Sequence, residues 1–449
     1  MSFSGIERFI SPDELFFSTT DRRGLIRSGN SVFVRVSGFS LDELTGAPHS
    51  IVRHPGMPAG AFRLIWERLL HGRPAGAYVR NLAKDGSHYW VFATMTPSPD
   101  GFLSVRVAPR TPLADEVKRL YKDVADVELE AAARDGATRR DVARAGQERL
   151  EELLGEMGFG SHDVFLTEAL TGEVVTRGRL ASAVYARSRR RGPIAEVLAG
   201  AGALASTLAD LVLRLEDYRQ LSERLLRSFA EVLAVARRLD RAIEAAQTAS
   251  AAVAATAPVL HNTARVMAVP AGKAVAALER LAPRLASLRS DVADLRLGIA
   301  LASLHTDMIA AFAAEVLDGV APPTSLGEVP LLCDVVHGSV LDLSARAGRV
   351  NQALREVVAE VAEAGERLAE FHRFLGQWRL LVLRRRAGAA LGDLVRPIDD
   401  EFAASWDGMD MLRSLSAEFE ASAVPFDVAE LEERVMRIRA DALAYRDAS

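Results

Sequence analysis

The sequence predicts an α+β N-terminal domain, a five-stranded antiparallel sheet with inserted helices, followed by a long all-helical bundle or coiled coil. Up to Pro112, short β-rich runs alternate with turn dipeptides, whereas beyond it Pro and Gly thin out and helix formers dominate. In the second part, apolar residues recur at helical spacing over a stretch far longer than an ordinary globular helix. We therefore expect a compact domain at 1–112, a helical linker at 113–160 and an all-helical region at 161–449.

The first 112 residues contain the expected elements in the order ββαααβββ. Turn sequences DRRG and KDGS join strand pairs, and three helices follow the second strand. The second helix has Ser40 as its N-cap and Glu43 at the reciprocal capping position. The expected strands are 15–20, 25–28, 77–83, 87–97 and 102–108, and the expected helices are 30–38, 40–46 and 58–72.

A Pro- and His-rich loop, PHSIVRHPGMPAGAF at 48–62, precedes the third helix. A metal site is disfavoured because His49 and His54 lack a carboxylate or cysteine at ligand spacing. A catalytic histidine is disfavoured because no Ser or Cys stands in a nucleophile context. The loop best suits a lid over a ligand, since its prolines stiffen the backbone while Arg53 and His54 supply donors.

Several motifs of this part stand together in a known order: STTD, N-x-x-F-V-x-V-S-G-F, ELTGAPHSIVRHPGMP and KDGSHYWV. With them, residues 15–112 resemble the PAS sensor domain of bacterial aerotaxis receptors. The resemblance implies a PAS fold with a pocket for FAD, shaped by Asn30, Arg53 and His54. Structural roles are the alternative: Asn30 as a helix cap, and Arg53 and His54 as braces of the loop.

Two positions depart from the family pattern. Gly56 replaces an aspartate in the loop, and Ala75 replaces a tryptophan after the third helix. The pocket thereby loses a charge and an aromatic wall, whose stacking contributes on the order of 0.5–1.5 kcal/mol beyond burial. Three alternatives follow: weak flavin binding, another small ligand, or a cofactor-free dimerisation module.

Beyond residue 115 the sequence predicts helices only. A long apolar stripe predicts a helix that is buried against other helices, and self-association into a homodimer would cover what one chain cannot. The stripe is formed by Leu208, Leu211, Leu215, Tyr218, Leu221, Leu225, Phe229, Val232, Ala236, Leu239 and Ile243. Further helices are expected at about 113–134, 277–319, 340–387, 398–421 and 427–446.

The segment DLRLGIALASLHTDMIAAFAAEVLDG loosely resembles the hairpin tip of chemoreceptor signalling domains. Its polar signature is not kept, because His305, Ile309 and Phe312 stand where the family has Asn, Glu and Arg. The resemblance therefore implies that contacts to a chemotaxis kinase are absent or altered. An ordinary Ala- and Leu-rich amphipathic helix is the alternative.

Composition narrows the function classes. A net charge of −5 from 55 basic and 60 acidic residues gives no general field for nucleic acid. The single cysteine, Cys333, excludes an intramolecular disulfide. No signal peptide, confident membrane span, phosphate-binding Gly loop or catalytic triad is found in the sequence. We expect a cytoplasmic, non-enzymatic sensory protein with an unknown downstream partner, or alternatively a scaffold whose PAS domain mediates assembly.

Overall fold

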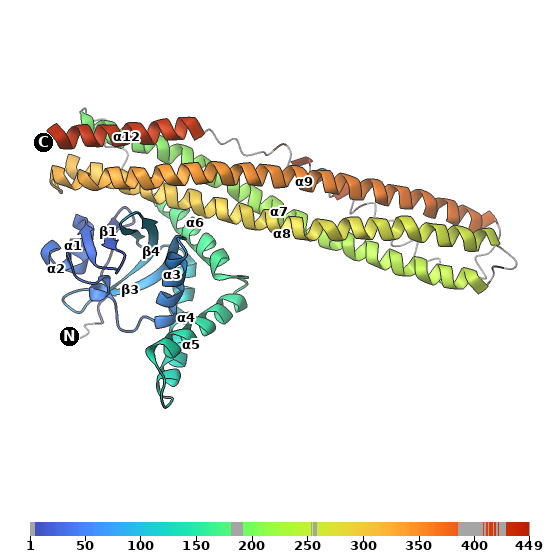
Figure 1. Cartoon of the computed structure of the whole chain (residues 1–449), viewed down its shortest axis with the longest axis horizontal. Coiled ribbons are helices and arrows are strands. Elements are labelled where there is room, and N and C mark those ends of the chain that lie inside the picture. Colours follow the sequence, from blue (N-terminus) through green and yellow to red (C-terminus); the bar gives the residue numbers. More distant parts are fainter. Residues whose placement is uncertain are drawn as a thin grey trace. The chain divides into compact units, whose positions relative to one another are not determined.

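The computed structural model describes residues 5–180, 192–252, 254, 258–384 and 428–448, with isolated positions between 407 and 421 (Figure 1). The chain divides into two compact units. The first comprises Met1–Val212, Asp294–Ser344 and Asp427–Ser449, and the second comprises Leu213–Ala293 and Ala345–Phe426. The domain boundaries expected from the sequence, at residues 112 and 160, stay predictions.

A five-stranded antiparallel sheet forms the N-terminal domain, as predicted. Its strand order is β2-β1-β5-β4-β3. The strands are β1 (Leu15–Asp21), β2 (Ile26–Gly29), β3 (Ala75–Leu82), β4 (His88–Ser98) and β5 (Gly101–Val107). In the part of the chain that the structure describes, no strand follows β5, which confirms the change of architecture.

The helices inserted between β2 and β3 are α1 (Ser31–Ser37), α2 (Leu41–Leu44), the 3-10 helix η1 (His49–Val52) and α3 (Ala59–Leu70). The predicted capping box is present on α2, where Ser40 accepts from the Glu43 amide and Glu43 accepts from the Ser40 amide. Helix α1 ends at Gly38, whose positive φ of 73° suits a glycine C-cap. These local signals explain why the sequence located the three helices correctly.

The two faces of the sheet are covered by different elements. On the inner face, Arg106 of β5 contacts η1 and α1 through His49 and Phe33. On the outer face, aromatic contacts connect the strands to later helices, namely α4 (Pro112–Ala132), α6 (His162–Leu180) and α8 (Pro258–Leu317). The ring pairs are Trp90 with Tyr121 at 6.3 Å, Tyr78 with Phe165 at 6.4 Å, and Phe17 with Phe312 at 5.1 Å.

Helices α3 and α5 (Arg139–Glu156) pack closely where Gly60 meets Gly146. A Cβ on Gly60 would lie 2.2 Å from the Gln147 main-chain nitrogen and 2.3 Å from the carbonyl carbon of Gly146. Neither atom belongs to a flexible side chain, so only movement of a whole helix could relieve such a contact. The crossing therefore requires glycine at position 60.

The remaining described elements are α7 (Pro193–Ala252), the 3-10 helix η3 (Pro323–Glu328), α9 (Val329–Arg384) and α12 (Val428–Ala448). Apart from Leu239, whose side chain lies outside the described set, every residue of the predicted apolar stripe is buried. Within the second unit, ion pairs connect neighbouring helices: Arg237–Glu279 joins α7 to α8, and Arg280–Glu363 joins α8 to α9. These exposed pairs contribute little, so the buried stripe is the main source of cohesion.

Helix α8 begins well before the expected residue 277. Pro270 and Pro283, which usually interrupt a helix, lie inside it. Most of the segment expected to form a helix at 398–421 lies outside the described residues.

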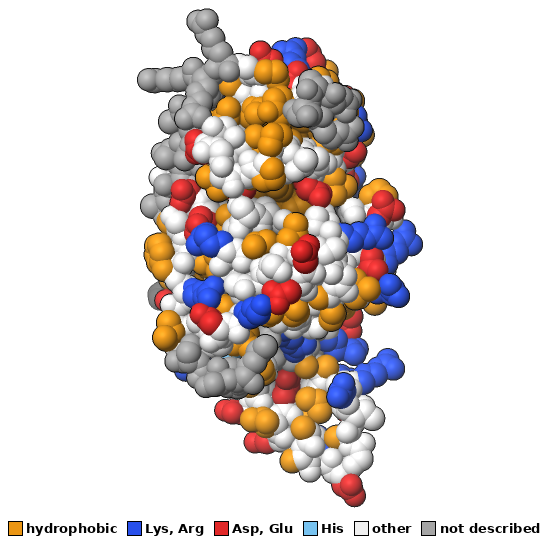
Figure 2. All heavy atoms as spheres, turned by 90° about the vertical axis from the view of Figure 1, so that its left-hand side faces the viewer, with side chains coloured by type: hydrophobic (Ala, Val, Ile, Leu, Met, Phe, Trp, Pro, Cys, Tyr) orange, Lys and Arg blue, Asp and Glu red, His pale blue; other side chains and the backbone are white. Residues whose placement is uncertain are grey.

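Two helical segments, Pro193–Arg238 and His261–Leu317, are long and apolar enough to cross a membrane by length and composition alone. In the most apolar window of the second, 89% of residues are buried inside the protein, which accounts for its composition without a membrane. Figure 2 shows one face of the molecule, on which basic, acidic and hydrophobic side chains are intermixed.

Replacement of Gly60 by alanine should destabilise the protein by about 1–3 kcal/mol, because the new methyl group meets the main chain of α5. The matched control is Gly155→Ala on α5, where an added Cβ meets nothing within 4 Å and should stabilise by up to about 1 kcal/mol. Urea unfolding of both variants measures the difference. Equal stability of the two would show that the crossing is not tight.

Candidate functional site

A polar cluster of four side chains lies on the inner face of the sheet: Ser18, His49, Tyr89 and Arg106. Arg106 is only 4% exposed, and its Nη2 atom donates to Ser18 Oγ at 2.8 Å and to His49 Nε2. Because a guanidinium has only donors, His49 must accept through Nε2 and is therefore neutral. Burial and the charge of Arg106 hold the pKa of His49 well below its usual range, which agrees with this assignment.

Tyr89 belongs to the same face by strand register. Ala93 pairs with Arg106 across β4 and β5, and Tyr89 lies four positions from Ala93 along β4. The Tyr89 ring stacks on Phe16 at 5.8 Å, and Phe16 is the cross-strand partner of Arg106. Its hydroxyl is buried and has no hydrogen-bond partner in the part of the chain that the structure describes. The cluster thus contains a donor that the fold leaves unused.

Arg53 and His54 follow η1 and run beside β3. The Arg53 guanidinium lies 3.9 Å from the centre of the Phe62 ring on α3 and donates to the Met57 carbonyl at 3.2 Å. His54 donates its main-chain N–H to the Arg80 carbonyl, and its Nδ1 accepts from the Gly56 amide at 3.0 Å. Both side chains therefore hold the loop, whatever further role they have.

Burial lowers the pKa of His54 to about 4, with contributions from the positive charge of Arg80 and from His88. At neutral pH the ring is uncharged, which suits Nδ1 as an acceptor from Gly56.

Asn30 is buried at the junction of β1 and α1, and its hydrogen bonds go to these two elements and not to the loop. Its Oδ1 accepts from the amides of Phe17 and Phe33, and its Nδ2 donates to the Leu15 carbonyl at 2.8 Å. The side chain caps α1 and fixes it to β1, which corresponds to the structural alternative drawn from the sequence. The assignment of Asn30, Arg53 and His54 to a cofactor pocket remains a prediction.

An acidic group that the loop lacks at Gly56 comes from a distant helix. The carboxylate of Glu128 on α4 accepts from the amides of Ala59 and Gly60 at 2.8 and 2.7 Å, and so caps α3. Burial lowers the pKa of Arg53, and the negative charge of Glu128 opposes that shift. Glu128 lies on the apolar face of α4, four residues after the buried Val124 and three before the buried Ala131. An acidic residue within this apolar stripe was the available signal, although the sequence does not identify its partners on α3.

On the outer face, Glu173 of α6 connects the end of the sheet to two helices. Its carboxylate, 1% exposed, accepts from the Tyr78 hydroxyl at 3.0 Å, from the Arg110 amide at 2.7 Å and from the Thr111 hydroxyl at 2.6 Å. Thr111 is the N-cap residue of α4. A single buried carboxylate therefore fixes the point at which the chain leaves the sheet and enters α4.

Helix α6 is also joined to α3 and to α8 by ion pairs. Arg68 of α3 pairs with Asp163, Arg296 of α8 with Glu168 at 2.5 Å, and Arg177 with Asp307 of α8. Each arginine side chain in these pairs is at most 7% exposed. Such pairs are costly to break singly, since each would leave a buried charge behind. They fix α6 between the sheet and α8.

The C-terminal end of α8 lies against β1 and α1. Ser31 donates to Glu315 at 2.8 Å, Phe312 contacts Phe17, and His305 Nε2 lies 3.5 Å from the Thr96 hydroxyl of β4. Ile309 and Phe312 are buried, as are the predicted core residues Ile299, Leu301 and Leu304. The segment that resembles a chemoreceptor tip is thus covered by the sheet.

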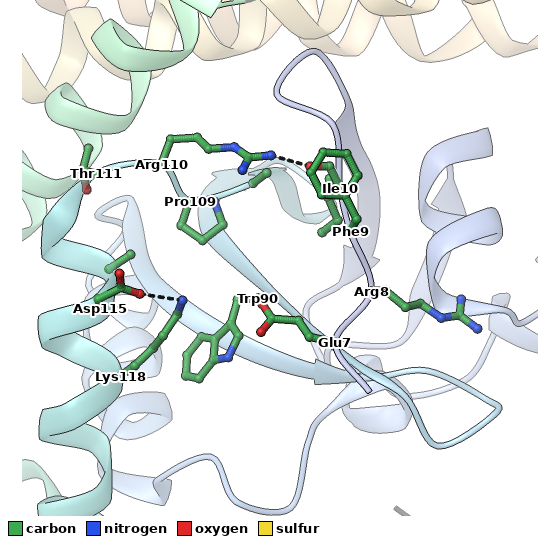
Figure 3. A pocket seen from close by; sticks show the side chains of 12 residues that line it. Glu7, Arg8, Phe9, Ile10, Trp90, Pro109, Arg110, Thr111, Asp115 and Lys118 are labelled. Atoms are coloured by element: carbon green, nitrogen blue, oxygen red, sulfur yellow. Dashed lines mark hydrogen bonds and ion pairs between the residues drawn. The ribbon is translucent and has the colours of Figure 1, made fainter. Parts of the chain in front are cut away.

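A separate open pocket of about 440 Å³ lies beside α4 on the outer side (Figure 3). Lys118 of α4 lies 5.5 Å from the Trp90 ring, and Arg110 lies 5.5 Å from the Phe9 ring and donates to the Ile10 carbonyl. Lys118 also pairs with Asp115. Lys118 and Arg110 already contact groups of α4, β4 and the N-terminal segment. The pocket therefore indicates no particular ligand.

Replacement of Glu173 by alanine should lower stability by at least about 3 kcal/mol, because several buried donors lose their acceptor at about 1–3 kcal/mol each. Hydrogen exchange should accelerate at the amides of Arg110 and Thr111. The control Tyr78→Phe removes one donor only and should cost about 1 kcal/mol. Unchanged exchange at both amides would contradict the assigned role.

Comparison with known proteins agrees with this geometry. A model described as the PAS fold matches residues 27–103. The aerotaxis receptor of Escherichia coli (strain K12) is 42% identical over 118 residues, which is 25% of this chain and 23% of that protein. The chain therefore matches less than a quarter of that relative.

Similar solved structures include a light-oxygen-voltage domain studied with a flavin analogue, 19% identical with a TM-score of 0.22, covering 24% of this chain and 86% of that one. A PAS domain from Colwellia psychrerythraea is 21% identical with a TM-score of 0.19, covering 21% and 88%. The N-terminal part of this chain is a PAS domain, in a segment similar to the aerotaxis receptor, and it is followed by long helices.

Proposed function

We propose that this chain is a cytoplasmic, non-enzymatic sensory protein in which the PAS domain senses redox state, oxygen or a small ligand and transmits the signal to the helical region. The observation that carries this proposal is the buried connection of the sheet to α6 and α8 through Glu173 and the ion pairs of α6. A domain present only as an assembly module would not need a rigid connection at the exit of its sheet.

FAD is the proposed ligand, on the strength of the similarity to the aerotaxis receptor. The inner face offers what a flavin requires: the buried aromatic residues Phe16 and Phe33, the unpartnered hydroxyl of Tyr89, and a buried guanidinium. When bound, the flavin would supply reversible electron transfer, and the protein would supply orientation and electrostatics. Arg53 and His54 would act by holding the loop over the ligand.

The proposed transmission runs through the sheet to its outer face. β1 contacts the cluster through Ser18 and contacts α8 through the adjacent Phe17, so a displacement of β1 reaches both sides. Two discrete packings of α6 and α8 against the sheet would then serve as the two states. We further propose that the chain acts as a homodimer upon an unidentified protein partner. A cofactor-free scaffold is the rival function.

Visible absorbance of the purified full chain tests this directly. We expect a flavin spectrum after incubation with FAD, and a several-fold lower occupancy in Arg53→Ala, because the loop loses its contact with Phe62 and Met57. The control Arg27→Ala changes an exposed residue of β2 and should keep full occupancy. A chain that takes up no flavin would favour the scaffold.

A reconstituted assay with a chemotaxis histidine kinase and its coupling protein tests the output. We expect no stimulus-dependent kinase activation, because Ile309 and Phe312 are buried and replace the charged tip residues. A chemoreceptor signalling fragment provides the positive control. Robust activation by this chain would refute the proposal that it does not signal through a chemotaxis histidine kinase.

A further inference from the structure

Arg106 has more donors than the fold uses. A guanidinium carries five N–H groups, and the two on Nη2 are directed to Ser18 and His49. In the part of the chain that the structure describes, Nε and Nη1 make no hydrogen bond, and no carboxylate forms an ion pair with this residue. Three donors of a nine-tenths buried cation therefore remain available.

An uncompensated buried charge is expensive, and buried arginines are normally paired. Burial lowers the pKa of Arg106 to about 10, so the side chain is still a cation at neutral pH. The neighbouring ionisable groups do not compensate it, because His49 is neutral and burial raises the pKa of Tyr89 above the ordinary value. Among the described residues, none supplies the negative charge or the further acceptors that this guanidinium lacks.

The surroundings define the shape of that acceptor. The Arg106 guanidinium lies 5.2 Å from the centre of the Phe33 ring, which is stacked on His49 at 5.8 Å with an interplanar angle of 3°. The Phe16 and Tyr89 rings form a second stacked pair, with an interplanar angle of 8°. Flat rings beside unused donors suit a planar molecule with oxygen acceptors on one edge.

We infer that Ser18, His49, Tyr89 and Arg106 form the recognition site for an anionic or strongly accepting oxygen of a planar ligand, with Arg106 as its counter-cation and Tyr89 as a second donor. This inference rests on the proposed function where the ligand is a flavin, whose ring presents carbonyl oxygens. A planar free carboxylate presents the same chemistry, and the experiment separates the two sources.

The test uses the full chain, stripped of small molecules, and titrates it with FAD, with riboflavin and with benzoate by calorimetry. Riboflavin contains the ring without phosphates. If a substitution lowers the affinities for FAD and for riboflavin equally, the residue therefore recognises the ring. Arg106→Met should weaken ring binding about tenfold or more, because a charged hydrogen bond contributes about 1.5–3 kcal/mol. Arg106→Lys should lose less, and Arg27→Met on the exposed part of β2 should bind like the wild type.

Tyr89→Phe separates recognition from folding. Its hydroxyl makes no hydrogen bond within the described structure, so its removal should leave the stability of the ligand-free protein unchanged or higher. Ligand affinity should nevertheless fall several-fold. This variant keeps the proposal testable if Arg106→Met does not fold.

A second readout is the midpoint potential of the bound flavin. A nearby cation favours the more negatively charged, reduced form, so Arg106→Met should shift the potential to a more negative value while Arg106→Lys largely restores it. Unchanged affinity and potential in both Arg106→Met and Tyr89→Phe would overturn the inference while leaving flavin binding intact. Binding of benzoate alone, lost in Arg106→Met, would support the recognition site and refute the flavin function. Failure of every probe to bind the wild type would overturn both.

Discussion

The carboxylate of Glu173 is the group on which the connection between the sheet and the helices depends. It is buried where the chain leaves β5, and it accepts from the Arg110 amide, the Thr111 hydroxyl and the Tyr78 hydroxyl together. A helix N-terminus presents amides without internal partners, and here a residue from another helix supplies the acceptor. The same helix, α6, contributes acidic or basic partners to α3 and to α8. Because the arginine of each pair is buried, a displacement of α6 that broke these pairs would leave buried charges without partners.

Because both faces of the sheet are covered, polar residues of its strands can be buried on either face. In an antiparallel sheet with one wet face, an arginine in an alternating strand is expected to face solvent. β5 has Val105 and Val107 on the face packed against later helices, so the intervening Arg106 is directed into the domain. Its burial there results from η1 and α1, which cover the inner face, while the later helices cover the outer face. The polar cluster and the helical covering are two results of one arrangement.

Local signals in the sequence were sufficient for the elements but not for the site. The strands, the capping box of Ser40 and Glu43 and the N-cap role of Asn30 depend on residues close in the chain, and all were predictable. The length of α8 was underestimated because Pro270 and Pro283 are tolerated within a helix supported by its neighbours. Arg106, Glu128 and Glu173 acquire their roles only from partners far away in sequence. Composition and spacing do not identify such distant partners, since a charged residue on a helix or a strand usually faces solvent.

Side chains alternate between the two faces of a strand, which directs Arg106 inward. The same alternation lets one strand contact both the inner cluster and α8. Ser18 and Phe17 are adjacent in β1, yet one meets Arg106 and the other meets Phe312 of α8. Asn30 fixes the main chain of Phe17 to the start of α1, and the neighbouring Ser31 donates to Glu315 of the same α8. A change in the inner cluster that displaced Ser18 would therefore act on α8 at two points, an aromatic contact and a hydrogen bond. Close packing makes such a displacement a choice between discrete arrangements, because the Phe17 and Phe312 rings are buried and cannot shift continuously.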